Sequence, residues 1–408
     1  MNFYDIGRSG LCLGCGVCTA LSPLNIKAKE KNGILLPNFK ELDNSGITPS
    51  CCCPAIEPEI NKHVFDKFQT KLDASNIDIG IYKNIFLTSS LDDNILEKSS
   101  SGGLITEIAL YLLENKIVDG VITQTIEYSE SGPRTKDFIA RTREDVMKAQ
   151  CSKYCPTNIE ESLKGIMDDK KGSYCLIGLP CQINAVKKAE TAGLIRKDLI
   201  KYTIGNFCGG FKDYRELDDL IIRNGKNPAK VKYFQFRGGG QPGFLKISDN
   251  TGEDVKIKYP KYGAGSYINK FDRCTLCIDA TALLADFSCG DAWLDERSKK
   301  IDQATLVIAR TEEAENMLNK LIDLKRIISY RASENDVRIS QKHNLDSKIF
   351  RQNKRRIVYR LFGKRVPIYD VDIPESKTSI LYELKVYIGK IKLNIFYILK
   401  VKLGLKRK

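Results

Sequence analysis

Cysteine is the residue type that stands out in this chain of 408 residues, which contains 14 cysteines and only two histidines. The stretch "CLGCGVC" places Cys12, Cys15 and Cys18 at C-x2-C-x2-C spacing. This spacing is typical of thiolates wrapped around an iron–sulfur cubane, and Gly14 and Gly16 allow the tight loop that turns successive sulfurs inward. The stretch therefore predicts a 4Fe-4S cluster. A zinc knuckle is the alternative, because zinc also accepts four thiolates.

The fourth ligand of this cluster has to come from outside the run. Ser22 stands where a ferredoxin-type run would place its next cysteine. The stretch "CCCP" at 51–54 offers Cys53 directly before a proline, and we predict Cys53 as the fourth ligand. Cys51 and Cys52 are the alternative candidates for the fourth ligand.

The elements that must position further thiols alternate strand, loop and helix, the order typical of a parallel sheet. A Ser/Gly loop precedes an amphipathic helix expected at about 104–115 and a strand expected at about 118–126. The pattern returns as a strand ending near Gly178, a helix, and a strand ending near Phe207. We therefore predict an α/β fold with a parallel-sheet core.

A second group of thiols follows from this sheet. Cys181 and Cys208 come directly after two predicted strands, and ligands bind beyond the carboxyl ends of parallel strands. If the two strands are neighbours, both thiols reach one crevice, and "RCTLC" adds Cys274 and Cys277. Four thiolates are enough for a second 4Fe-4S cluster. The alternative is that Cys181 and Cys208 are ordinary small core residues. A further cysteine, Cys175, lies inside an apolar strand, and we interpret it as a core residue.

The loop that opens the first helix offers backbone amides at Ser100, Ser101, Gly102 and Gly103. Amides at a helix N-terminus can cradle a phosphate, with Lys153 of "CSKYCP" as a charge partner. The alternative is that serine and glycine only cap the helix. The stretch "FRGGGQPG" at 236–243 is either a substrate loop or a turn, and its Arg237 favours an anionic ligand.

The sequence contains no obvious general acid. Lys153, Asp286 and Asp291 are the candidates, although buried salt bridges are the preferred interpretation of the two aspartates. Both histidines, His63 and His343, are expected at the surface.

Together these pieces resemble a known family, the beta subunits of coenzyme F420 hydrogenases and dehydrogenases, which includes a chlorophyll-pathway reductase that removes a hydroxyl from a hydroxymethyl group. The shared pieces are "CLGCGVC", "SSGG", "SKY", "GLPCQI", "NFCGG" and "RCTLC...ADFSCGDAW", in the family's order over about residues 10–295. The resemblance implies an iron–sulfur flavoprotein that contains FAD. It implies that Cys181, Cys208, Cys274 and Cys277 bind the cubane near the flavin. It also implies that Ser100, Ser101, Gly102, Gly103, Ser152, Lys153 and Tyr154 lie against FAD.

The expected function is an oxidoreductase that passes electrons between two 4Fe-4S clusters, FAD and a two-electron donor or acceptor. The redox partner would be a ferredoxin or a reduced deazaflavin, and the substrate a small molecule or a glycan-linked compound, which would suit polysaccharide biosynthesis. The alternative is a non-catalytic electron-transfer subunit of a larger redox complex. A zinc-stapled nucleic-acid-binding protein is a third hypothesis, but no aromatic-rich basic strand or recognition helix supports it, so no nucleic-acid partner is expected.

The net charge of +14 is uneven along the chain. Residues 376–408 contain nine Lys or Arg and one acidic residue, Glu383, so they carry +8 of this total. Their lysines do not keep to one helical face, and the expected contact is an anionic membrane surface, an acidic partner subunit or solvent. Because no signal peptide or spanning segment is recognised, we expect the protein in the cytoplasm. If the basic tail contacts a membrane, we expect the protein at its inner face.

Four segments follow from these assignments. They are a ferredoxin-like 4Fe-4S segment (1–72), the N-terminal α/β part of the flavoprotein core (73–165), its C-terminal flavin and iron–sulfur part (166–330) and a basic helical tail (331–408).

Overall fold

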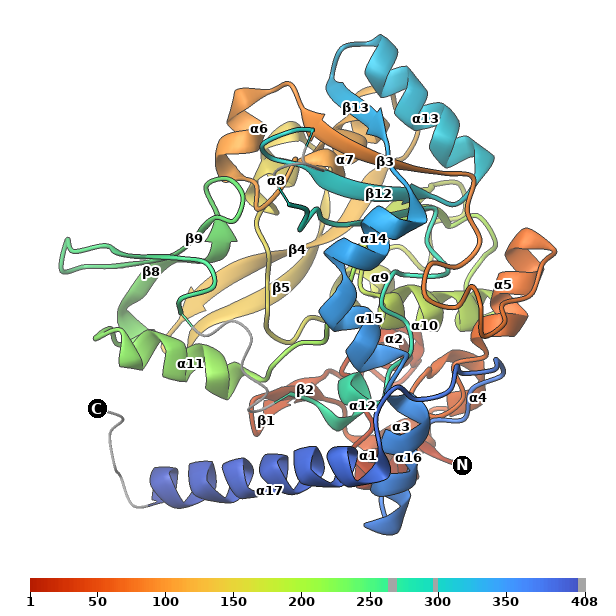
Figure 1. Ribbon diagram of the computed structural model, residues 1–408, viewed down its shortest axis with the longest axis vertical. Helices are drawn as coiled ribbons and strands as arrows, with labels where there is room; N and C mark the ends of the chain where they lie inside the picture. Colours follow the sequence, from red (N-terminus) through yellow and green to blue (C-terminus); the bar gives the residue numbers. More distant parts are fainter. Residues whose placement is uncertain (263–269, 296–299, 403–408) are drawn as a thin grey trace.

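An eight-stranded sheet forms the centre of the computed structural model, which describes residues 1–262, 270–295 and 300–402 (Figure 1). Its strands are β3 (Asn84–Ser90), β4 (Gly120–Ser129), β5 (Gly132–Ala140), β6 (Tyr174–Gly178), β7 (Ile200–Asn206), β11 (Phe287–Asp291), β12 (Thr305–Ala309) and β13 (Ile327–Arg331). Their order is β13-β3-β12-β11-β7-β6-β4-β5. The four strands β4, β6, β7 and β11 run parallel, whereas the outer pairs are antiparallel. The predicted α/β class is confirmed, and the predicted parallel sheet corresponds to the centre only.

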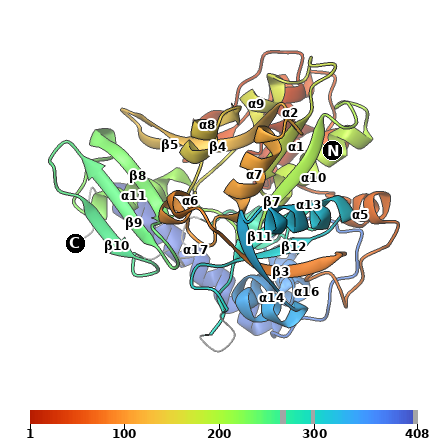
Figure 2. The ribbon, with the colours of Figure 1, turned by 90° about the horizontal axis from the view of Figure 1, so that it is seen from above.

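Helices cover both faces of this sheet, as is usual where parallel strands form its centre. The helices α7 (Leu104–Glu114) and α13 (Glu312–Asp323) share one hydrophobic core with one face, and α10 (Pro180–Thr191) packs on the other. Figure 2 shows α7 and α10 with the sheet between them. The predicted helix at 104–115 and the predicted strand ends at Gly178 and Phe207 agree with the structure within about one residue.

The N-terminal residues pack against α10. They form the helices α1 (Phe3–Ser9), α2 (Val17–Leu21), α3 (Phe39–Asp43), α4 (Pro49–Cys52) and α5 (Ile60–Phe68), with a hairpin of β1 (Lys29–Lys31) and β2 (Ile34–Leu36). Their apolar side chains join the same core as α10. The cysteines of this segment therefore lie next to the helix that carries Cys181.

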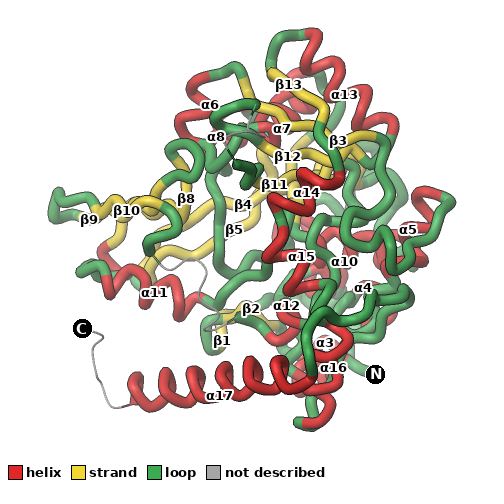
Figure 3. Tube along the Cα trace, in the orientation of Figure 1, coloured by secondary structure: helices red, strands yellow, loops and turns green. Residues whose placement is uncertain are grey.

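A smaller antiparallel sheet lies beside the main one, as the tube in Figure 3 shows. It consists of β8 (Val231–Gly238), β9 (Phe244–Asp249) and β10 (Val255–Lys258), with α11 (Tyr214–Arg223) packed on it. Phe234, Leu245 and Leu217 form part of its separate core.

The end of the chain is helical. It contains α14 (Glu334–Ser340), α15 (Lys342–Lys348), α16 (Gln352–Leu361) and α17 (Ile380–Lys402). The remaining short helices are α6 (Asp93–Lys98), α8 (Arg143–Lys148), α9 (Glu160–Lys164), η1 (Pro228–Lys230) and α12 (Asp272–Thr275). Over the described ranges, the helices include none with the length and apolar character needed to cross a bilayer.

The prediction that both histidines lie at the surface is wrong for His63, whose side chain is fully buried in α5. His63 lies three residues after Ile60 and one before Val64, so all three fall on the same helical face, which packs into the core. His343 in α15 is exposed, as expected.

Candidate functional site: two adjacent thiol sets

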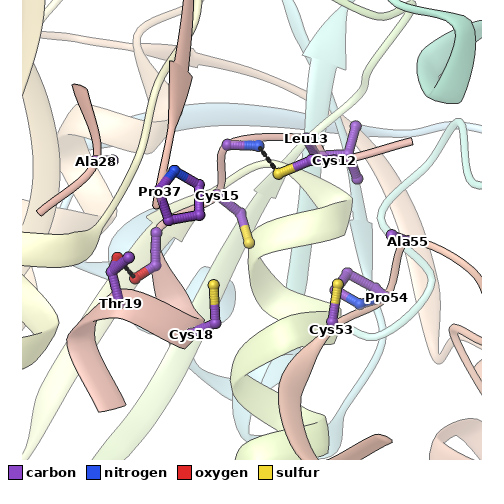
Figure 4. Close-up of a pocket in the computed structure, with 12 residues that line it drawn as sticks. Cys12, Leu13, Cys15, Cys18, Thr19, Ala28, Pro37, Cys53, Pro54 and Ala55 are labelled. Carbon is purple, nitrogen blue, oxygen red and sulfur yellow. Dashed lines mark hydrogen bonds between the residues drawn. The ribbon is translucent and has the colours of Figure 1, made fainter. Parts of the chain in front are cut away.

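The first thiol set, Cys12, Cys15, Cys18 and Cys53, lines a single pocket. The sulfurs lie around a common space between the N-terminal loop and the Cys53–Pro54 turn (Figure 4). Gly14 is required in this loop, because its φ is +63° and an added Cβ would lie 2.4 Å from the carbonyl oxygen of Leu35. The amide of Gly14 donates a hydrogen bond to Cys12 Sγ at 3.4 Å.

Cys53 is the member of the "CCCP" run that faces this pocket. The helix α4 ends at Cys52, and Cys53 adopts an extended conformation, so it leaves the helix that contains Cys51 and Cys52. Cys52 is buried in the hydrophobic core, and the Sγ of Cys51 lies 3.2 Å from Thr48 Oγ1. Ser22 ends α2, and its hydroxyl donates to the carbonyl of Leu24.

The thiols of the first set are held in their neutral form by their surroundings. Burial, together with the nearby Cys53, raises the pKa of the Cys15 thiol to about 12. Burial also raises the pKa of Cys53, while the Ala55 amide, Arg273 and Lys188 act against that rise. Because ligation requires thiolates, bound metal would supply the charge that ionises them.

The donor set fits a cubane in its chemistry, because four thiols line one pocket. Among the described residues, no three His, Cys, Asp or Glu side chains converge on a position for a single metal ion. The four sulfurs of the first set instead border a shared pocket, and a cubane spaces its thiolate ligands more widely than one zinc ion does.

The second thiol set, Cys181, Cys208, Cys274 and Cys277, lies where the parallel strands end. The strands β6 and β7 are hydrogen-bonded neighbours, as the crevice prediction required. Burial raises the pKa of Cys181 well above its usual value, and the other three thiols of this set and Cys15 raise it further. The amide of Gly210 donates to Cys208 Sγ at 3.3 Å.

A buried lysine that the sequence did not reveal lies against the second set. Lys348 of α15 donates to Cys277 Sγ at 3.6 Å and to the carbonyl oxygen of Asp279 at 2.7 Å. Burial disfavours its charge, but the surrounding thiols of Cys208 and Cys277 raise the pKa of Lys348 above its usual value. No local motif signals this residue, because it follows Cys277 by 71 positions.

The two thiol sets adjoin each other. Cys15 of the first set is close enough to Cys181 of the second to raise its pKa. Leu13, from the first loop, is packed in one apolar cluster with Phe211, Phe271 and Cys274. This cluster connects the loop of the first set to the second set through apolar contacts.

The residues predicted to lie against FAD come together in part. Ser152 Oγ lies 3.0 Å from Ser100 Oγ, and Ser100 Oγ donates to the carbonyl of Arg237 at 2.7 Å. Arg237 is buried and donates to Tyr154 Oη at 3.0 Å and to Asp291 Oδ2 at 2.6 Å. Its Nε has no hydrogen-bond partner among the described residues. The hydroxyls and this orphaned N–H are groups that a phosphate or a ribityl chain can bond.

The remaining members of this group hold the loop in place. Gly102 and Gly103 are buried, and an added Cβ at Gly102 would lie 2.3 Å from the carbonyl oxygen of Thr88. Ser101 Oγ lies 3.1 Å from Thr305 Oγ1. The amine of Lys153 donates to three backbone carbonyls, those of residues 149, 150 and 151, so its pairing with a phosphate stays a prediction.

The interpretation of the two aspartates as salt-bridge partners is confirmed. Asp286 lies 2.8 Å from Lys67 Nζ, and Asp291 pairs with Arg237. Both carboxylates are thus engaged by cations in this structure.

Comparison with known proteins identifies the family. The pattern described as "Coenzyme F420 hydrogenase/dehydrogenase, beta subunit N-term" matches residues 85–164, and the companion pattern for the C terminus of the same beta subunit matches residues 171–334. The chain belongs to the coenzyme F420 hydrogenase/dehydrogenase beta subunit family. This family match contains the loop of residues 100–103 and the second thiol set. It also contains all strands of the main sheet except the first residue of β3, Asn84.

Two curated members of this family show how far the likeness extends. A coenzyme F420-dependent sulfite reductase of Methanocaldococcus jannaschii is 24% identical over 79% of this chain, which spans only 47% of that reductase. A coenzyme F420 hydrogenase subunit beta of Methanococcus voltae is 26% identical over 60% of this chain and 82% of its own length.

A solved structure of the family supports the fold. It is a chain in the F420-reducing NiFe hydrogenase complex from Methanosarcina barkeri, with a TM-score of 0.55 and 22% identity. The likeness covers 71% of this chain and 97% of that one.

Proposed function

We propose that this protein is an iron–sulfur flavoprotein subunit that passes electrons between two 4Fe-4S clusters, FAD and a two-electron carrier. Cys12, Cys15, Cys18 and Cys53 would hold the first cluster, and Cys181, Cys208, Cys274 and Cys277 the second. The names of its relatives, an F420 hydrogenase subunit and an F420-dependent sulfite reductase, support a deazaflavin coenzyme as the carrier.

The observation that carries this proposal is that Leu13, in the loop of the first set, packs in one apolar cluster with Cys274 and Cys181 of the second set. When bound, the clusters would supply one-electron chemistry and FAD the exchange between one-electron and two-electron steps. Leu13 and its apolar neighbours connect the two thiol sets, and the Gly14 and Gly210 amides donate to sulfurs of Cys12 and Cys208. Such hydrogen bonds and burial set the potential of a cluster.

The flavin would bind at the Ser100 loop beside α7. The start of α7 leaves N–H groups without intrahelical partners, which is the property that suits a pyrophosphate. Ser100, Ser152 and the buried Arg237 would add hydroxyl and guanidinium donors. The Arg237–Asp291 pair fixes this guanidinium against the loop.

The relatives favour a role as one subunit of a larger complex. One relative is named as a hydrogenase subunit, and another is a chain in a solved hydrogenase complex. The chain would then exchange electrons with a catalytic partner subunit. A small or glycan-linked substrate and a role in polysaccharide biosynthesis stay predictions.

The test uses the full chain purified without oxygen. We expect about eight iron atoms and one FAD per chain, with a broad visible absorbance that dithionite bleaches. Cys181→Ser is expected to lose about half of the iron, whereas Cys175→Ala, in the core of the preceding strand, keeps it. A colourless protein reconstituted with iron, sulfide and FAD would overturn the proposal.

A further inference from the structure

The helix α17 (Ile380–Lys402) is a feature that the proposed function does not use. It lies outside the family match, which ends at residue 334. In Figure 1 it runs along the lower edge of the molecule and extends past the hairpin of β1 and β2. Its first turns pack against α16, where Tyr387 contacts Tyr359 and Phe362.

The exposed surface of α17 carries no acidic side chain in the part that the structure describes. Its one acidic residue, Glu383, is 2% exposed. The carboxylate of Glu383 accepts hydrogen bonds from Arg351 at 2.5 Å and from Arg355 at 3.1 Å. Lys385 and Lys392 are exposed, and these two cations face solvent with no helix carboxylate to neutralise them.

Apolar side chains are exposed on more than one side of the same helix. The large exposed ones include Leu381, Val386, Ile388, Leu393, Ile395 and Leu399. Leu393 and Ile395 are about half exposed. Two residues that are two positions apart in an α-helix point about 200° apart around its axis, so these side chains lie on nearly opposite sides. A helix with apolar and basic side chains on several sides can still lie at a membrane surface, because the long stems of its lysines reach back to the headgroups from the apolar boundary.

We infer that α17 is a membrane-surface helix that lies in the headgroup region of an anionic bilayer. Its leucines and isoleucines would enter the acyl boundary, and the lysines would extend their stems so that the ammonium groups reach lipid phosphates. Each lysine near an anionic surface increases the partition constant about fivefold.

This surface also has a defined relation to the thiol sets. Lys390 of α17 forms a 2.5 Å ion pair with Asp272, the first residue of α12, which carries Cys274. Binding through α17 would therefore place the second thiol set on the membrane side of the protein.

The test is sedimentation of the full chain with vesicles of phosphatidylcholine, with or without phosphatidylglycerol. We expect binding to the vesicles that contain phosphatidylglycerol and a large loss of binding at about 1 M salt, because salt screens the lysines. The double variant Lys385→Gln/Lys392→Gln should lower the partition constant about 30-fold. Leu393→Ser/Ile395→Ser should weaken binding without changing the charge.

The matched control is Lys170→Gln/Lys171→Gln, which removes the same charge from exposed positions before β6. This control is expected to bind as the unchanged protein does. Equal loss in the control, or equal binding to uncharged vesicles, would overturn the inference. A second result would also overturn the inference. In it, vesicles sediment none of the unchanged protein, and the two lysines instead hold a dimer, or a complex with an acidic protein, that dissociates in Lys385→Gln/Lys392→Gln.

Discussion

Arg273 donates a hydrogen bond from Nη2 to the carbonyl oxygen of Pro54 at 2.8 Å. Its Nε donates to the next carbonyl, that of Ala55, at 2.7 Å. Arg273 directly precedes Cys274, and Pro54 directly follows Cys53. One buried guanidinium thus bonds a ligand-bearing turn of the second thiol set to a ligand-bearing turn of the first.

The first prediction concerns this guanidinium. Arg273→Lys keeps the charge but cannot donate to both carbonyls in the same geometry, so we expect the free energy of unfolding to fall by about 2 kcal/mol. Urea unfolding measures this change. Arg331→Lys, at a 61% exposed side chain, is the control and should change stability by less than about 0.5 kcal/mol. Equal losses in the two variants would contradict the role of Arg273.

The fourth ligand of the first cluster is tested by serine substitution. Cys53→Ser should lose about four iron atoms per chain, because it removes one thiol from the first set. Cys51→Ser is the matched control from the same run and should keep its iron, since Cys51 lies against Thr48. Iron and sulfide analysis with electron paramagnetic resonance checks both. The assignment fails if Cys51→Ser loses the cluster and Cys53→Ser retains it.

Lys348 is predicted to raise the reduction potential of the second cluster. Lys348→Met removes a buried positive charge beside Cys277, and a positive charge favours the more negative, reduced state. We expect the midpoint of that cluster to fall on the order of 60 mV, the equivalent of about 1.4 kcal/mol for one electron. The first cluster provides the internal control in the same redox titration. Parallel shifts of both midpoints would refute a local effect.

Gly102 is predicted to be essential to the flavin loop. In Gly102→Ala the new Cβ would lie 2.3 Å from the Thr88 carbonyl and 2.7 Å from the Thr305 amide, so the loop has to move. We expect a loss of about 1–3 kcal/mol of stability and a lower FAD content. Gly389→Ala, where nothing lies within 4 Å, should leave FAD unchanged and stabilise α17 by about 0.5–1 kcal/mol. Full FAD occupancy in Gly102→Ala would count against the loop as the flavin site.

His63 is predicted to make the protein sensitive to acid. Burial, together with the nearby Lys188, lowers the pKa of His63 from 6.5 to about 4. The unfolded chain therefore binds a proton at higher pH than the folded chain does. The contribution of His63 to stability is complete above pH 6.5 and is lost as the pH falls toward about 4.

The variant His63→Leu removes this titration. Between about pH 6.5 and 4.5, the unchanged protein should lose on the order of 2 kcal/mol more stability than the variant. Urea unfolding across this range measures the difference, with the exposed His343→Gln as control. Superimposable pH profiles for the unchanged protein and His63→Leu would rule the prediction out.

Much of the candidate site could be predicted from the sequence because its ligands obey local rules. The spacing of Cys12, Cys15 and Cys18 and the proline after Cys53 indicated the set that the structure gathers around one pocket. The place of Cys181, directly after a strand, indicated the crevice. These signals work because tight loops and strand ends fix the direction of a side chain within a few residues.

Other features depend on pairings that no local pattern encodes. The antiparallel strands β12 and β13 flank β3, more than 200 residues earlier in the chain, and periodicity does not specify a strand's partner. Lys348 and Arg273 reach their partners over long sequence separations. His63 was predicted at the surface because a polar residue is usually exposed, but its place on an apolar helical face decided otherwise.

The link between Arg273 and the turn after Cys53 has a consequence for the order in which the protein is made. All four thiols of the first set are synthesised before Arg273, yet the carbonyls behind Cys53 bond to this arginine, about 220 positions later in the chain. Metal delivered to the early chain would meet a complete set of sulfurs in an unfinished fold. Delivery after residue 273 has emerged would meet the same sulfurs already fixed. If the proposed cluster binds here, the timing of its insertion would decide whether iron organises this turn or enters a turn that is already formed.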